Sequence, residues 1–198
     1  IGMNLTVIPF TGKKKDGKFC FFEELEKILE YNKFVIKNGD VLVISSKFIS
    51  NSQGRILEIN NSKVCNKAKE IAKKFNSNEK FMEIVFRESD NILGGVAGFV
   101  MSTTNGILAP NAGIDKSNSK GTKIILYPNE PYNFAEELKR KIFLELNLHV
   151  GIIIVDSRLM PARIGTTGVA IACAGIEPTK DLRGEKDLDG NPLKVTFQ

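Results

Sequence analysis

Tryptophan is absent from this sequence, histidine occurs once and cysteine occurs three times. His149 has no second histidine near it, which argues against a zinc site and against a Ser-His triad. Cys20, Cys65 and Cys173 are scattered and form no Cys-x-x-Cys pair, so we expect buried, reduced thiols. These scarcities favour a cytoplasmic protein without a disulfide framework.

Long apolar runs and the common phosphate loops are also missing. No apolar run reaches the roughly 18–20 residues that a membrane-spanning helix needs, and no secretion signal is visible. Neither G-x-x-x-x-G-K-[ST] nor a G-x-G-x-x-G that opens a helix occurs, so a nucleotide would be held by neither of these loops. We expect Ile1 and Gly2, which precede Met3, to be a cloning remnant, and a single domain over residues 3–198.

What is present is typical of a soluble globular protein: 198 residues, 42% apolar and 26% charged. This length allows one well-buried core, or two small interleaved lobes. The formal net charge of +5 favours anionic partners such as nucleotides, although lysines on a solvated helix face explain it equally well. Charge alone therefore decides nothing about function.

The apolar pattern predicts an α+β fold with mixed or antiparallel sheets and flanking helices, because strands and helices do not alternate strictly. Helices are expected around 22–29, 64–75 and 79–88 and from 133 to about 147, with Asn61 or Ser62 capping the second and Asn133 the last. Strands are expected at 5–10, 41–45, 55–59, 98–103, 107–109, 123–127, 150–155, 169–174 and 193–197. Asn105-Gly106 is a hairpin signal.

A carboxylate directly follows the most apolar run of the chain. Asp156 comes after residues 150–155, and Ser157 lies beside it. A carboxylate at the end of a buried strand is partly desolvated and needs a counter-charge, which a divalent ion or an arginine supplies. Arg158 and Arg163 follow closely. A metal ligand and a turn-capping aspartate paired with Arg163 therefore both remain open.

Two further polar segments follow predicted strands. Residues 109–118 gather Asn, Asp and Ser side chains, including Asp115 and Asn118. Such loops bind hard cations or phosphate, but the same composition is typical of an Asx-turn. Ser46 and Lys47, with Ser50 nearby, suit phosphate oxygens or mark an ordinary strand-to-helix junction.

Together and in this order, these segments resemble the coenzyme F420-0:L-glutamate ligase family, the γ-glutamyl ligases that build the tail of a deazaflavin coenzyme. The resemblance runs from the first predicted strand to the last residue. It is carried by residues 39–43, 46–47, 53–55, 87–89, 111–115 with Asn118, 156–157 with Pro161 and Arg163, 174–178 and 181–184. The Asn-Ala-Gly-x-Asp and Asp-Ser segments are the most diagnostic.

The resemblance implies a γ-glutamyl ligase-like fold and GTP-dependent amide synthesis, with Mg²⁺ or Mn²⁺, often K⁺, and a homodimer. It implies that Asp115 and Asp156 are catalytic and bind one divalent ion, and that Ser157 contacts a second ion. The implied nucleotide contacts are Gly12, Lys13, Ser46, Lys47, Asn51 and Asn118, and Arg158 and Arg163 are candidates for a substrate phosphate. Carboxylates that hold metal ions, plus a lysine, are a sufficient set for phosphoryl transfer.

The chain departs from the family pattern near the phosphate site. Asn51 stands where lysine is usual, Gln53 stands where glutamate is common, and we hypothesise that Arg158 replaces an arginine absent at Met160. The family continues past Gln198 with a helical segment, so we expect a truncation. The alternative to a ligase is a non-catalytic homologue that binds a nucleotide or flavin-like phosphate. Nucleic-acid binding is disfavoured because the aromatic residues fall on predicted core faces.

Overall fold

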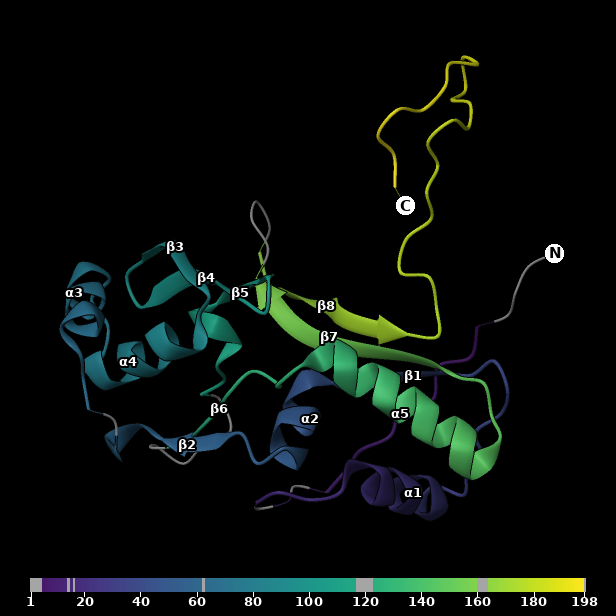
Figure 1. Cartoon of the computed structure of the whole chain (residues 1–198), viewed down its shortest axis with the longest axis horizontal. Coiled ribbons are helices and arrows are strands. Elements are labelled where there is room, and N and C mark those ends of the chain that lie inside the picture. The colour runs from purple at the N-terminus through teal and green to yellow at the C-terminus, as the bar shows by residue number, and fades with distance from the viewer. Residues whose placement is uncertain are drawn as a thin grey trace.

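The computed structural model describes residues 5–13, 15, 17–61, 63–116, 123–159 and 164–197. Within these ranges helices flank three small sheets, which confirms the predicted α+β class (Figure 1). The first sheet has the order β1 (Val41–Ser45), β7 (Gly151–Leu159), β8 (Thr166–Ala174). The second pairs β2 (Ile56–Glu58) with β6 (Lys123–Ile125), and the third has the order β3 (Asn91–Val96), β4 (Phe99–Thr104), β5 (Ile107–Pro110). β1 and β7 are parallel, whereas the other pairs are antiparallel.

The helices fall into two groups. Around the first sheet lie α1 (Phe21–Tyr31), α2 (Ser46–Ser52) and α5 (Pro131–Leu146) (Figure 1). Beside the third sheet lie α3 (Asn66–Lys74) and α4 (Glu79–Glu88), and two short 3-10 turns, η1 (Ile59–Asn61) and η2 (Asn111–Gly113), connect elements. No described helix combines the length and the apolarity that crossing a membrane requires.

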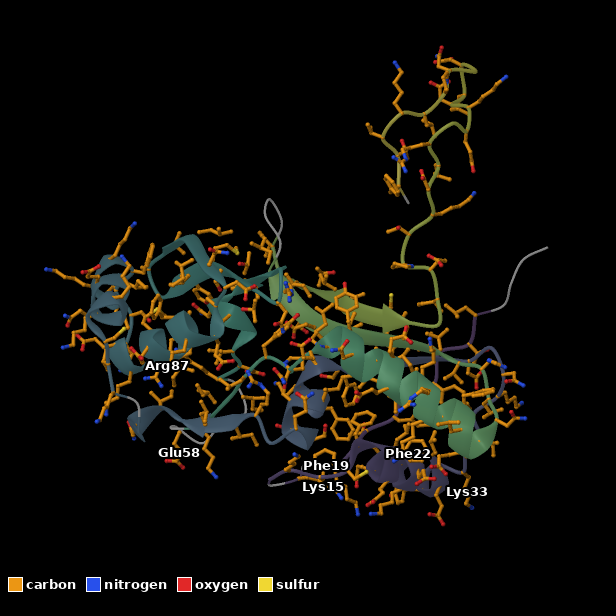
Figure 2. All side chains as sticks on the ribbon, viewed as in Figure 1. Lys15, Phe19, Phe22, Lys33, Glu58 and Arg87 are labelled. Atoms are coloured by element: carbon orange, nitrogen blue, oxygen red, sulfur yellow. The ribbon has the colours of Figure 1, made fainter. Side chains whose placement is uncertain are left out.

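The first hydrophobic cluster joins α5, α1 and the sheet around β7. Leu138 and Ile142, four positions apart on α5, pack against this sheet. Ile152 and Ile154 of β7 share one face because strand side chains alternate. Phe22 completes the cluster from the side of α1 that faces α5 (Figure 2). Each such burial contributes roughly 1.5–3 kcal/mol, so this cluster fixes α5 on the sheet.

A separate cluster joins α3, α4 and the third sheet. Phe81, Met82 and Val85 line the buried side of α4 and meet Val100 of β4. Ala112, in the turn that follows β5, belongs to this second cluster. The segment that carries Asp115 is therefore attached to one cluster and β7 to the other.

Two strand predictions were wrong: no segment of the described chain pairs with residues 5–10, and the last predicted strand makes only an isolated bridge, between Phe197 and Asp181. Residues 5–10 and 193–197 form no strand in the described chain, and Leu5 and Val7 are exposed. Conversely, β3 was missed, because Gly94 and Gly95 interrupt its apolar alternation. β1 and α4 coincide with the predicted segments, and the predicted hairpin at Asn105 joins β4 to β5.

Two predicted helix caps were wrong. α3 begins after Cys65, whose Sγ accepts the Ala68 N–H at 3.4 Å, rather than after Asn61 or Ser62. α5 begins after Glu130, because Pro131 suits the first helical turn, rather than at Asn133. Cys20, Cys65 and Cys173 are free as expected, but none is fully buried: the first two are exposed and Cys173 is partly exposed.

Candidate functional site

A cavity of about 20 Å³ lies where β1 and β6 end, beside Asp156 of β7. Its lining residues are Ser46, Lys47, Ser50, Gly113, Asp115, Ile125, Leu126, Tyr127, Pro128 and Asp156. Parallel pairing places Ser45 opposite Val155, so the residues that follow, Ser46 and Asp156, become neighbours although 110 positions separate them. The Ser46 hydroxyl donates to Asp156 Oδ1 at 2.8 Å. Asp115 and Asp156 therefore line the same cavity.

β7 continues to Leu159, so Asp156 lies within the strand rather than directly after it, as the sequence had suggested. The strand extends because its ladder with β8 continues to that residue. Side chains alternate along a strand, so Asp156 and Arg158 share one face and Ser157 lies on the other, where it is exposed. Ser157 does not line the cavity, and its contact with a second ion stays a prediction.

A turn with left-handed backbone conformation places Asp115 at the cavity. The φ angles of Asn111, Ala112 and Gly113 are 49°, 56° and 67°. This conformation costs a residue with a Cβ roughly 1–2 kcal/mol, so surrounding contacts must hold it. After the turn, Asp115 pairs with Ile125 of β6 through two backbone hydrogen bonds of 2.9 and 3.0 Å.

Two buried hydrogen bonds hold the turn against β4. The Val100 N–H donates to Asn111 Oδ1, and the Ala112 N–H donates to Ser102 Oγ, both at 2.9 Å. Ala112 is fully buried in the second hydrophobic cluster. The strained turn is thus determined by its packing, which fixes the position of Asp115.

Tyr127 connects this turn to β7. A Cβ at Gly113 would lie 2.3 Å from Tyr127 Cδ2, so only glycine admits the ring. The Tyr127 hydroxyl accepts from Arg158 Nη2 at 3.1 Å, and Arg158 Nε lies 3.6 Å from Asp156 Oδ2. Burial raises the pKa of Tyr127 to about 12, although the guanidinium beside it opposes the shift, so the phenol is neutral near pH 7. Contacts therefore run from Gly113, two residues before Asp115, through Tyr127 and Arg158 to Asp156.

Each aspartate has a cationic partner. Lys47 forms an ion pair with Asp115, and Arg158 pairs with Asp156. The Lys47 side chain is 31% exposed, whereas that of Arg158 is 6% exposed. The carboxylates are thus neutralised by one accessible and one buried cation.

The donor atoms suit a hard divalent cation. Ser50 Oγ is buried at the cavity and has no hydrogen-bond partner among the described residues. Asn51 does not line the cavity, but its buried Oδ1 also has no partner among the described residues. Such atoms point to a water, ion or ligand. The described residues contain no group of three or more His, Cys, Asp or Glu side chains placed to hold a metal. Mg²⁺ is often held by one or two carboxylates plus substrate phosphates, so Asp115 and Asp156 fit it once Lys47 leaves.

Comparison with known proteins gives the family. A family model described as F420-0:Gamma-glutamyl ligase matches residues 14–198. This chain belongs to that family. The protein named Coenzyme F420:L-glutamate ligase of Archaeoglobus fulgidus is 36% identical over 198 residues, which are 99% of this chain and 77% of that protein. The proteins of the same name from Methanopyrus kandleri and Methanocaldococcus jannaschii are 32% and 34% identical over 82% of this chain, and the matches span 65% and 66% of their own lengths.

Some residues that the family resemblance indicated are not at the cavity. Gly12 and Lys13 do not line it: Gly12 packs near Ile28 and Phe48, and Lys13 Nζ lies 6.0 Å from the ring centre of Tyr31. Their contacts with nucleotide stay predictions. Asn118 and Arg163 lie outside the described residues, as do Met160 and Pro161.

Sequence reasoning placed Arg158 at a substrate phosphate and did not single out Tyr127. The structure gives Arg158 buried contacts with Asp156 and Tyr127, and its phosphate role stays a prediction. Tyr127 ended a predicted strand and was indistinguishable from a core aromatic. Only its place opposite Gly113 reveals its part in the site.

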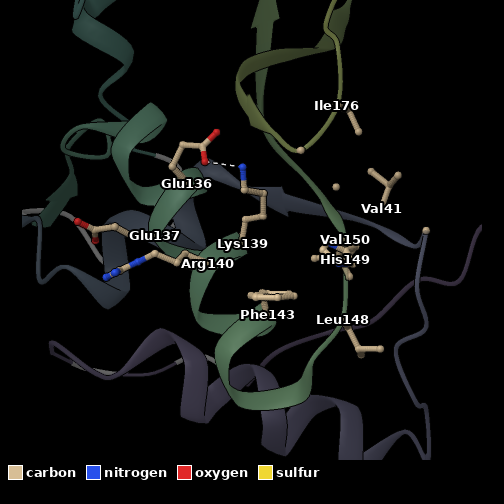
Figure 3. Close-up of a pocket in the computed structure, with 13 residues that line it drawn as sticks. Val41, Glu136, Glu137, Lys139, Arg140, Phe143, Leu148, His149, Val150 and Ile176 are labelled. Carbon is tan, nitrogen blue, oxygen red and sulfur yellow. Dashed lines mark ion pairs between the residues drawn. The ribbon is translucent and has the colours of Figure 1, made fainter.

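A larger cavity of about 870 Å³ opens between α5 and the start of β7 (Figure 3). There Lys139 pairs with Glu136 at 2.6 Å, and the Phe143 and His149 rings lie 4.8 Å apart. None of the predicted site residues lines this cavity. The smaller cavity, which joins both aspartates, is therefore the candidate active site.

Proposed function

We propose that this protein is an acid–amino-acid ligase that joins L-glutamate to a carboxylate of the coenzyme F420 precursor, using GTP and a divalent metal. Family membership and relatives named Coenzyme F420:L-glutamate ligase support the ligase class and the glutamate substrate. The structural observation that carries the proposal is that Asp115 and Asp156 line one cavity together with Lys47 and Ser46. The chain spans about two thirds of the Methanopyrus kandleri protein, so the activity itself belongs to this proposal.

The proposed reaction has two steps. The substrate carboxylate takes the γ-phosphoryl group of GTP, which releases GDP and forms an acyl phosphate. The glutamate amine then attacks the acyl carbon, the amide bond forms, and phosphate and a proton are released. Repetition on the new γ-carboxylate extends the tail.

The chain's residues supply positioning and charge. Asp115 and Asp156 would hold Mg²⁺ or Mn²⁺, whose chemistry is to neutralise phosphate charge as the phosphoryl group moves. Lys47 supplies a point charge for phosphate oxygens, and Ser46 supplies a hydroxyl. Ser157 at a second ion, K⁺ and a homodimer belong to the same proposal, and light scattering after gel filtration measures the oligomeric state.

Product mass tests the ligase activity. We expect coenzyme precursor incubated with protein, GTP, L-glutamate and Mn²⁺ to gain mass in steps of one glutamyl residue. Asp156→Asn should abolish the gain, whereas Asp189→Asn, on an exposed turn, should not. A complete absence of product from a folded wild-type protein would contradict catalysis.

Thermal stabilisation separates the alternatives, because a ligand that binds the native state raises its melting temperature. Stabilisation by GTP with Mn²⁺, without any product, would indicate the non-catalytic homologue. Equal stabilisation by ATP would contradict the preference for GTP.

A further inference from the structure

The candidate site holds its own cations in a space too small for a hydrated metal ion. The cavity of about 20 Å³ has room for roughly one water molecule. Mg²⁺ keeps several of its waters when proteins bind it. Lys47 and Arg158 already pair with Asp115 and Asp156. A divalent cation and both lining cations therefore do not fit together, and one side chain must move.

Burial indicates which cation moves. Lys47 is about one-third exposed, and its ammonium is carried on a flexible four-carbon stem. A partly exposed ion pair contributes little stability, so breaking it is easy. Arg158 is almost fully buried and donates to Tyr127 Oη, so its departure would leave the Tyr127 hydroxyl without its donor and the half-buried Asp156 without its cation. Lys47 is the exchangeable partner and Arg158 the permanent one.

We propose that Lys47 couples nucleotide binding to cation binding by exchanging partners. Its ammonium pairs with Asp115 until a nucleotide phosphate draws it away, and a divalent cation then takes the place of the ammonium beside the Asp115 carboxylate. This inference rests on the proposed function, because it needs a nucleotide and a cation at this site. Coupling between two ligands is reciprocal, so the cation must raise nucleotide affinity by the factor by which nucleotide raises cation affinity.

Titration with Mn²⁺ in the absence of nucleotide tests the exchange, because direct contact between Mn²⁺ and phosphate then plays no part. Electron paramagnetic resonance of free Mn²⁺ gives the affinity without any assay of activity. We expect Lys47→Met to bind Mn²⁺ about 10-fold more tightly than wild type, within the range of typical coupling factors. The same variant should bind GDP more weakly in the presence of a chelator.

Two further variants separate exchange from general repulsion. Lys123→Met removes the same charge from an exposed position of β6, two residues before Ile125 of the cavity, and should leave Mn²⁺ affinity unchanged. Lys47→Arg keeps the charge and binds a carboxylate more firmly, so it should weaken Mn²⁺ binding below wild type. If Lys47→Met and Lys123→Met both bind Mn²⁺ more tightly by the same factor, the cause is general charge repulsion, and the exchange by Lys47 is overturned.

The outcomes also separate this inference from the proposed function. If wild type binds Mn²⁺ and GDP and the Lys47→Met variant has the same Mn²⁺ affinity, the role of Lys47 is refuted and the proposed function is not. Folded wild type that binds neither ligand would refute the proposed function and the inference with it. Circular dichroism of each variant confirms that it is folded.

Discussion

Two Asp–Arg pairs with the same spacing offer a matched test of the buried network. Asp156 pairs with Arg158 and Asp181 pairs with Arg183, and the partners are two positions apart in each case. The Arg158 side chain is 6% exposed, whereas that of Arg183 is 54% exposed. Replacing either arginine by methionine keeps most of the apolar stem and removes the charge. The two substitutions therefore differ in the burial of the pair and in the hydrogen bond that Arg158 donates to Tyr127.

Arg158→Met leaves the carboxylate of Asp156 without its cation and the Tyr127 hydroxyl without its donor. Breaking a buried ion pair costs roughly 3–5 kcal/mol. Asp156 is 23% exposed and retains the hydrogen bond from Ser46, so we place the loss near the lower limit, about 3 kcal/mol. For a domain of this size that loss lowers the melting temperature by roughly 6–12 °C. Arg183→Met should leave the melting temperature unchanged, because a solvated pair contributes little.

Far-ultraviolet circular dichroism is the suitable probe, because the chain has no tryptophan for fluorescence. Thermal and urea unfolding of both variants should be measured beside wild type in one buffer. The reasoning fails if Arg158→Met and Arg183→Met unfold at the same midpoint. A lower midpoint for Arg183→Met alone would show that burial does not determine the strength of these pairs.

Three more substitutions test neighbouring contacts. Tyr127→Phe removes the acceptor of the buried guanidinium and should cost roughly 1–3 kcal/mol in urea unfolding, and an unchanged midpoint would argue against the hydrogen bond. The Cys65 N–H hydrogen bond is the main cause that holds the pKa of Glu83 below 4.5, so its stabilisation is complete above pH 4.5 and is lost as the pH falls through the folded-state pKa. The free energy of unfolding of Glu83→Gln, measured by urea titration at acid pH, should therefore depend less on pH than that of wild type. Gly113→Ala should destabilise far more than Gly106→Ala, because both positions have positive φ but only the first Cβ meets Tyr127; equal unfolding midpoints would contradict this packing.

Apolar periodicity found α1, α3, α4 and α5, because a buried helical face is a local property of sequence, but it did not predict the seven-residue α2. It located α4 at its observed bounds and α5 to within two residues at its start. Strands were less certain, since a strand exists only where another strand pairs with it. Leu5 and Val7 have the composition of a strand but no strand partner within the described ranges, whereas β3 has a partner in β4 despite Gly94. Composition does not contain that information.

The site was predictable in its residue types and not in its contacts. The oxygen-rich segments pointed to Asp115 and Asp156, and a family resemblance paired them. Their approach depends on the parallel register of β1 with β7 and on the bridge between Asp115 and Ile125, which join distant parts of the chain. The role of Arg158 followed from the extension of β7 beyond Val155, which local hydrophobicity did not predict.

The two carboxylates are held by different parts of the core, and this explains why a strained turn is tolerated at the site. Ala112 is buried in the cluster around α4, whereas Tyr127 is buried in the cluster around α5. Gly113 lies against Tyr127, so the missing Cβ lets the turn from one cluster meet the ring from the other. The separation of Asp115 from Asp156 is therefore set by contacts that cross between the clusters. Any change that loosens either cluster should alter the proposed cation affinity before it abolishes the fold.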